Sequence, residues 1–311
     1  MSMKSINRFK TSAEYEAAFL TLPEISLNYV DELDGLELLD NRCVIFTAEN
    51  AGSTIRLSKL STYQTLEYST DREAWNNMDT STTITLANVG DKVYIRGILS
   101  GDNTSSNRTQ FRMSGSIAAI GNCNALWDYR DLDAPLKNYC GHCMFFGCTS
   151  LTTAPELPAT IMKEYCYADM FSGCSNLTTA PALPATTLAD KCYQLMFNGC
   201  TSLTKAPELP ATTLADYCYE NMFYGCTSLT TAPKLPATKL ANFCYEYMFK
   251  NCTSLNNVTC LATDISAGFC TDNWLSGVSS VGTFTKAAGF DGWESGTSGI
   301  PSGWTIQDYV E

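Results

Sequence analysis

The order of apolar and polar residues divides this chain into regions with different periods. Between residues 42 and 121, short segments alternate apolar with polar side chains, and turn-forming residues such as Ala-Gly and Gly-Asp separate them. Alternation with a period of two is typical of strands that bury one face. We therefore predict a β-sandwich over residues 42–122, of the immunoglobulin-like kind that this strand and turn spacing favours. The expected strands are 43–47, 54–57, 65–69, 82–86, 92–96 and 110–113.

From about residue 140 the pattern repeats every 26 residues. The segment FYGCTSLTTAPKLP at 223–236 has a close copy, FNGCTSLTKAPELP, one period earlier. A period of 26 lies within the window of about 20–29 residues for leucine-rich repeats. No single unit can bury its own apolar face, so we predict a right-handed solenoid of stacked 26-residue coils over residues 123–276. Two ladders of cysteines follow the period: Cys148, Cys174, Cys200, Cys226 and Cys252, and Cys140, Cys166, Cys192, Cys218, Cys244 and Cys270.

Each 26-residue unit has two halves. The Thr-rich half, such as 227–236, contains two prolines that exclude a helix, so we expect an extended segment that pairs with the next coil. In the other half, such as 214–223, apolar residues fall at positions i, i+4 and i+8. That spacing places them on one face of a short helix. The sequence therefore predicts a multidomain α+β fold.

The two ends of the chain do not follow the repeat. Residues 1–41 predict a helix near 13–21 and a hairpin near 33–35. Residues 277–311 are rich in Gly, Ser and Trp. We interpret this tail as a cap, because the terminal coil of a solenoid has to be covered.

Charge narrows the range of partners. The chain has 32 acidic and 20 basic residues, a formal net charge of −12. Such a surface repels nucleic-acid phosphates and gains nothing from an anionic membrane. No stretch reaches the roughly 18 apolar residues that span a bilayer, and no secretory signal is visible, since residues 11–20 include two glutamates. We expect no nucleic-acid binding, no membrane insertion and no cofactor.

The fifteen cysteines are interpreted as structural, because eleven of them belong to the two ladders. Free cysteine packs as a small apolar side chain. Identical positions in stacked coils point their Cβ atoms in parallel, which is poor geometry for a disulfide. We therefore predict reduced ladders, with disulfides between coils as the alternative. Cys43, at the start of a possible edge strand, is expected to be more exposed.

Catalytic residues are scarce. His142 is the only histidine, so a nucleophile–histidine pair would have to use it. Cys140, His142 and Cys143 form a weak zinc candidate, but the other members of the Cys140 ladder have no histidine nearby. We predict no metal site and no catalytic residue. A glycosidase is the remaining enzyme alternative, although its candidate acids are better interpreted as solvated surface: Glu156, Asp169, Glu208 and Glu220.

Two aromatic columns follow the period beside the ladder cysteines. A residue that repeats without change favours packing between coils, which applies to Tyr167, Tyr193, Tyr219 and Tyr245. The other column varies, with a lysine among the aromatics, and is the candidate binding surface, since aromatic anchors dominate recognition surfaces. Asp216 and Glu220 are expected at its rim. The variable column is Tyr139, Tyr165, Lys191, Tyr217, Phe243 and Phe269.

The repeat resembles the BspA-like leucine-rich repeats over roughly residues 140–260. The matching residues are Met222-Phe223, Cys226, Ser228-Leu229 and Leu235-Pro236, with their equivalents in each coil. The chain departs from that family in its longer unit, with Ala-Pro-x-Leu-Pro where a plain strand is usual. The resemblance implies a surface protein of host-associated anaerobic bacteria that binds host or matrix proteins.

We therefore hypothesise a non-catalytic adhesin, extracellular or on the cell surface, that recognises a protein or glycan on another cell through its repeats. The alternative is a virion component, a phage tail-associated receptor-binding protein, since residues 5–35 are weakly similar to the starts of some tail-associated proteins. The sequence does not fix the oligomeric state.

Overall fold

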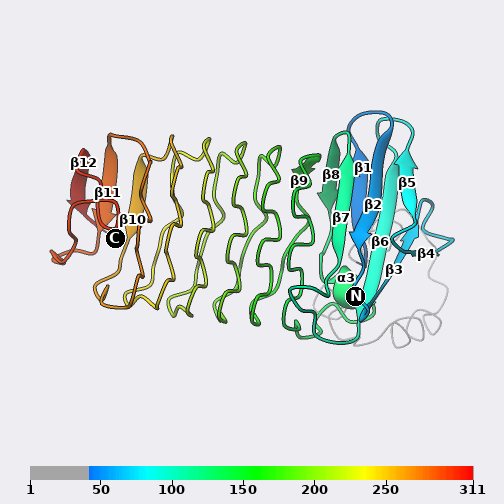
Figure 1. The fold of residues 1–311 in the computed structure, drawn as a ribbon, viewed down its shortest axis with the longest axis horizontal. Coiled ribbons are helices and arrows are strands. Elements are labelled where there is room, and N and C mark those ends of the chain that lie inside the picture. Colours follow the sequence, from blue (N-terminus) through cyan, green and yellow to red (C-terminus); the bar gives the residue numbers. More distant parts are fainter. Residues whose placement is uncertain (1–41, 311) are drawn as a thin grey trace, which may run out of the picture.

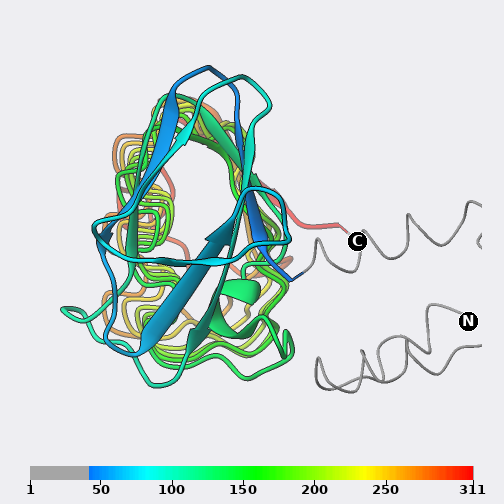
Figure 2. The same cartoon turned by 90° about the vertical axis from the view of Figure 1, so that its right-hand side faces the viewer.

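The computed structural model describes residues 42–310. Two antiparallel sheets occupy one end, stacked coils follow, and three parallel strands lie at the other end (Figure 1). Viewed from the end that carries the sheets, successive coils nearly superimpose (Figure 2). The helix and hairpin expected near 13–21 and 33–35 lie outside the described residues.

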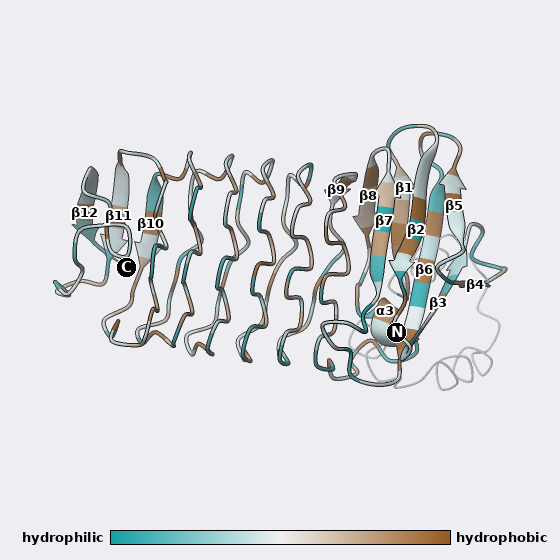
Figure 3. Ribbon diagram, in the orientation of Figure 1, coloured by the Kyte–Doolittle hydropathy of each residue, from teal (hydrophilic) through white to brown (hydrophobic). Residues whose placement is uncertain are grey.

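The first eight strands form two sheets that share a core. Apolar and polar residues alternate along them (Figure 3), so each sheet has one apolar face. The rings of Phe46 and Phe111, one from each sheet, lie 5.6 Å apart. The strands are β1 (Val44–Ala48), β2 (Ser53–Lys59), β3 (Gln64–Ser69), β4 (Asn76–Met78), β5 (Thr83–Leu86), β6 (Lys92–Leu99), β7 (Gln110–Ser114) and β8 (Ile117–Ile120).

The strand order is not that of an immunoglobulin domain, so this part of the sequence-based prediction is wrong. The larger sheet has the order β4-β3-β6-β1-β8-β9, in which β9 (Leu151–Thr153) comes from the first coil, and the smaller has β5-β2-β7. The first two strands of an immunoglobulin domain share a sheet, whereas β1 and β2 here lie in different sheets. Alternation and turn spacing locate strands, but they do not determine which strands pair.

The sheets continue directly into the coils. Strand β8 pairs in parallel with β9 (Leu151–Thr153), which belongs to the first coil. The core is also continuous, because the ring of Phe145 stacks on Phe111 at 5.3 Å and on Phe171 at 5.5 Å. Further phenylalanines extend this stack through the coils at 5.6–5.7 Å: Phe197, Phe223 and Phe249. The sheets thereby cover the apolar end of the stack.

The Thr-rich halves are extended and pair in parallel, as expected, but mostly through isolated bridges. Thr153 bridges Thr179, Thr179 bridges Lys205, and Thr231 bridges Asn257. Each bridge joins residues 26 positions apart. Proline has no backbone N–H to donate to a ladder, which accounts for short bridges in place of long strands.

The second half of each coil is a run of β-turns, so the predicted helix at 214–223 is wrong. The N–H groups of Cys218, Glu220 and Met222 each donate to the carbonyl three residues earlier. The N–H groups between them donate to the next coil, as Tyr217 does to Asn242 and Phe223 to Met248. Only one α-helix occurs in residues 42–310, the short α3 (Ala125–Asp128). The described chain is therefore built from strands and turns, with little of the expected α component.

The predicted cap region contributes strands to the stack. Strands β10 (Asn257–Cys260), β11 (Gly282–Lys286) and β12 (Trp304–Asp308) form a parallel sheet. Val258 pairs with Phe284, still 26 residues on, and Phe284 pairs with Ile306, 22 residues on. Trp274 takes the place of a methionine of the preceding coils and stacks on Tyr245 at 6.2 Å. The coil architecture thus continues after its sequence pattern has faded.

Candidate binding surface

The variable aromatic column forms a stacked, partly exposed strip along the turn side of the coils. We call it the aromatic strip: Tyr139, Tyr165, Lys191, Tyr217, Phe243 and Phe269. Tyr139 stacks on Tyr165 at 4.4 Å, Tyr217 on Phe243 at 4.4 Å, and Phe243 on Phe269 at 5.1 Å. All are half-buried except Phe269, which is 63% exposed. The strip therefore presents ring surface to solvent over several coils.

Lys191 connects the two aromatic stacks of the strip. Its Nζ lies 4.8 Å from the ring centre of Tyr165 and 5.1 Å from that of Tyr217. The same ammonium donates a hydrogen bond to the Tyr165 hydroxyl at 2.7 Å. This bond raises the pKa of Lys191 above its ordinary value. The lysine thus fills a gap between rings with cation–π contacts.

The two acidic residues expected at the rim are half-buried and bonded to neighbouring coils. The Asp216 carboxylate accepts hydrogen bonds from the backbone and side-chain N–H groups of Asn242 at 3.0 and 3.2 Å. Glu220 accepts one from the Gln194 amide. Glu246 lies one period after Glu220, and its pKa is raised first by burial and then by the charges of Glu220 and Asp272. A row of carboxyl groups therefore follows the same turn ribbon as the strip.

The constant tyrosine column lies inside the coils. Tyr167, Tyr193, Tyr219 and Tyr245 are at most 1% exposed. Tyr193 and Tyr219 stack at 5.8 Å, and burial raises the pKa of both hydroxyls. This column holds the coils together and offers nothing to a partner.

All fifteen cysteines lie within the described residues, and all are free and buried. Cys43 is 3% exposed and packs with Ile45 and Tyr94, so the expectation that it is more exposed is wrong. Burial raises the pKa of ladder thiols such as Cys200 to about 12. A thiol that stays protonated is a poor nucleophile.

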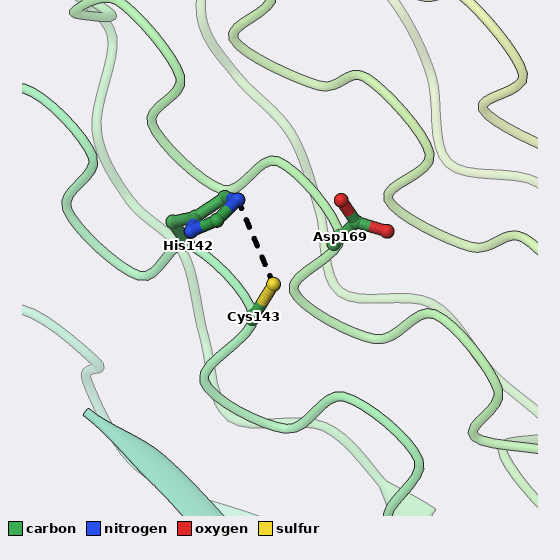
Figure 4. A group of neighbouring side chains, drawn as sticks. All are labelled: His142, Cys143 and Asp169. Atoms are coloured by element: carbon green, nitrogen blue, oxygen red, sulfur yellow. Dashed lines mark hydrogen bonds between the residues drawn. The ribbon is translucent and has the colours of Figure 1, made fainter. Parts of the chain in front are cut away.

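His142 and Cys143 form one further cluster, with Asp169 as the third member rather than Cys140. The Nε2 of His142 lies 3.6 Å from the Cys143 Sγ, and the ligand atoms of all three residues lie within 4.8 Å of one another (Figure 4). The sequence predicted a solvated surface position for Asp169, whereas its side chain is half-buried. The signal that could have found it is the repeat itself, since Asp169 lies one period after Cys143.

This cluster is not arranged as a catalytic triad. In such a triad the carboxylate bonds the histidine nitrogen that does not contact the nucleophile. Here the ring nitrogen that contacts Cys143 is also the one nearer Asp169 (Figure 4), and Nδ1 has no partner among the described residues. Burial lowers the pKa of His142 to about 4 and raises that of Cys143 to about 11. The pair therefore does not form a thiolate–imidazolium nucleophile.

The acids considered for a glycosidase lie on different sides of the coil. Glu156 and Glu208 are exposed on the Thr-rich half, whereas Asp169 and Glu220 are half-buried in the turn half. Glycoside hydrolysis requires two carboxyl groups facing one scissile bond, about 5–9.5 Å apart. The split between the two halves favours the solvated-surface interpretation for Glu156 and Glu208.

Comparison with known families gives a match to the BspA type leucine rich repeat region, in 6 copies, over residues 136–256 and 186–278. No curated protein and no solved structure matched the chain. Within residues 42–310, none of the helices has the length and apolar character needed to cross a bilayer. The matched residues include the aromatic strip and all members of both cysteine ladders. The recurring cysteine, Ser-Leu and Leu-Pro positions thus identify residues 136–278 as a BspA-type leucine-rich-repeat region.

Proposed function

We propose that this protein is a non-catalytic adhesin that acts at a cell surface and binds a protein or glycan of another cell through the aromatic strip. BspA-like repeats are often surface-associated and used for binding, and leucine-rich repeats typically mediate protein interactions. The proposal extends this general role to a particular surface and class of partner.

The observation that carries the proposal is the partly exposed stacking of the strip. Tyr217 and Phe243 are held face to face at 4.4 Å, yet both remain half-exposed. Aromatic side chains give large contact area at low entropic cost, and here the stacking already fixes their positions. The neighbouring carboxyl groups of Glu220, Glu246 and Asp272 favour a partner with basic or hydroxyl groups at its rim.

The proposal is tested with a glycan array and a host-cell binding assay, using wild-type protein and the double variant Tyr217→Ala/Phe243→Ala. The double variant is expected to lose binding, because truncating an aromatic anchor often costs more than about 1 kcal/mol. The matched control is Thr204→Ala/Thr230→Ala, which changes two exposed side chains on the Thr-rich halves. The control is expected to bind as the wild type does.

The loops of the two sheets are the competing recognition surface, and they carry exposed apolar side chains of their own. Tyr63 is 46% and Val89 67% exposed. We therefore include Tyr63→Ala/Val89→Ser in the same assays. Loss of binding in this variant, together with normal binding by the strip variant, would move recognition from the coils to the sheets and refute the strip.

A further inference from the structure

The first two coils together contain a group of three metal-ligating side chains that the later coils lack. His142 and Cys143 are adjacent in one turn, and Asp169 follows from the same position one coil later. The equivalents of His142 in the next three coils are Ala168, Gln194 and Glu220. Because the repeat forms without this group elsewhere, packing alone does not account for it.

The spacing of the group fits a tetrahedral zinc ion. Zinc–sulfur bonds of about 2.3 Å and zinc–nitrogen bonds of about 2.0–2.1 Å, at a tetrahedral angle, separate the two ligand atoms by about 3.5 Å. The Cys143 Sγ and His142 Nε2 are 3.6 Å apart, and the Asp169 carboxylate lies within 4.8 Å of both. We propose that His142, Cys143 and Asp169 together bind one zinc ion.

The burial and the few hydrogen-bond partners of the His142 imidazole are a second observation that supports a zinc ion at this place. The imidazole is 8% exposed, and its Nδ1 has no hydrogen-bond partner among the described residues. Within the described residues its Nε2 hydrogen-bonds only to the Cys143 Sγ, at 3.6 Å, and a thiol is a weak hydrogen-bond partner. A buried polar ring with so few partners is costly to fold. A bond from Nε2 to zinc offsets the part of that cost that comes from Nε2, and it leaves Nδ1 without a partner among the described residues.

The charges of the group are compatible with zinc. A thiolate and a carboxylate together balance the two positive charges of the ion, and His142 binds as the neutral imidazole. Three protein ligands leave a fourth position for water or a group of a partner.

The test uses the untagged full chain with cobalt(II) as a spectroscopic substitute for zinc, at neutral pH. Wild-type protein is expected to bind one cobalt per chain, with a thiolate-to-cobalt charge-transfer band, and added zinc is expected to displace it. Cys143→Ser is expected to lose the band. Asp169→Asn, which is nearly isosteric, is expected to weaken binding by more than about 100-fold, because loss of an outer-shell partner alone already costs 10–100-fold. Cys148→Ser changes a buried ladder thiol of the same coil and is expected to retain the site.

An NMR titration of the wild-type protein with zinc is a second test of the proposed site. His142 is the only histidine in the chain, so its imidazole signals in an NMR spectrum are unambiguous. Zinc at one equivalent is expected to shift them. Unchanged imidazole signals, or a cobalt band that persists in Cys143→Ser, would overturn the proposal. Because neither readout depends on the aromatic strip, failure here leaves the proposed adhesin function untouched.

Discussion

The thiol of Cys200 donates a hydrogen bond to the backbone carbonyl of Phe171, at 3.2 Å. The same bond, at 2.9–3.1 Å, recurs from Cys174 to Phe145, from Cys226 to Phe197 and from Cys252 to Phe223. Each of these bonds joins one coil to the coil before it. The cysteine at this position is therefore a small apolar side chain that also supplies a donor to a buried carbonyl.

We predict that Cys200→Ala lowers the free energy of unfolding by about 1–3 kcal/mol. The substitution removes the donor and leaves the Phe171 carbonyl with one hydrogen bond fewer in a buried site. Urea denaturation measures the change. Thr204→Ala, on the exposed face of the same coil, is the control and is expected to stay within about 0.5 kcal/mol of wild type. Equal stability of both variants would show that the thiol bond contributes nothing.

We predict that stability falls steeply as the pH rises above about 9. Burial raises the pKa of Cys192, Cys200 and Cys252 from the ordinary 9.0 to about 12. Between these values the unfolded chain loses thiol protons that the folded chain keeps, so each thiol's contribution, complete below pH 9, is lost as the pH rises to about 12. The slope is at most about 1.4 kcal/mol per pH unit for each thiol.

An alkaline titration followed by circular dichroism and by thiolate absorbance measures this effect. Both signals are expected to change together, because the thiols ionise only when the coils open. Thiolate absorbance that rises while the circular dichroism spectrum stays native would contradict the prediction.

The period of the repeat was predictable because the same inward positions recur in every coil. Cysteines such as Cys200 and Cys218 mark those positions directly, and both are fully buried. By contrast, the spacing of apolar residues in 214–223 is the same for a helix and for a run of turns, so the sequence could not distinguish the two. In the coil of Tyr217, backbone φ is positive at Tyr217, Asn221 and Gly225, four residues apart. A four-residue turn period places the same i, i+4 and i+8 side chains inward as a helix of 3.6 residues per turn does.

Other features could not be predicted for different physical reasons. Of the three left-handed positions in this coil, Gly225 and, less strongly, Asn221 have residue types that favour a positive φ, whereas Tyr217 does not. Strand β11 pairs in register with β10 although the repeat motif has disappeared, because backbone hydrogen bonds do not depend on side-chain identity. The zinc candidate depends on contact across two coils. The repeat period gives the register of Asp169 with Cys143, but the distances among the three side chains depend on how the two coils stack.

We predict that Lys191→Tyr stabilises the protein by about 0.5–1 kcal/mol, because a ring at this position would join the stack of Tyr165 to that of Tyr217. Lys191→Ala removes both cation–π contacts and is expected to destabilise it by about 0.5–1 kcal/mol. Thermal unfolding of the two variants measures both effects. A lower melting temperature for Lys191→Tyr than for Lys191→Ala would mean that the ammonium bond to the Tyr165 hydroxyl outweighs ring stacking.

We predict, finally, that Gly225→Ala destabilises the protein more than Gly225→Asn. Gly225 has a φ of +71°, a conformation that costs alanine about 1–2 kcal/mol. Asparagine enters this region more readily, and the next coil already places Asn251 there with a φ of +62°. The nearest atom to a Cβ added at Gly225 is the Gly199 Cα at 4.0 Å, so there is room for the Cβ of either residue. Urea unfolding of the two variants therefore compares the cost of a positive φ for alanine with that for asparagine. Equal losses of stability would show that this cost does not determine the effect of substituting Gly225.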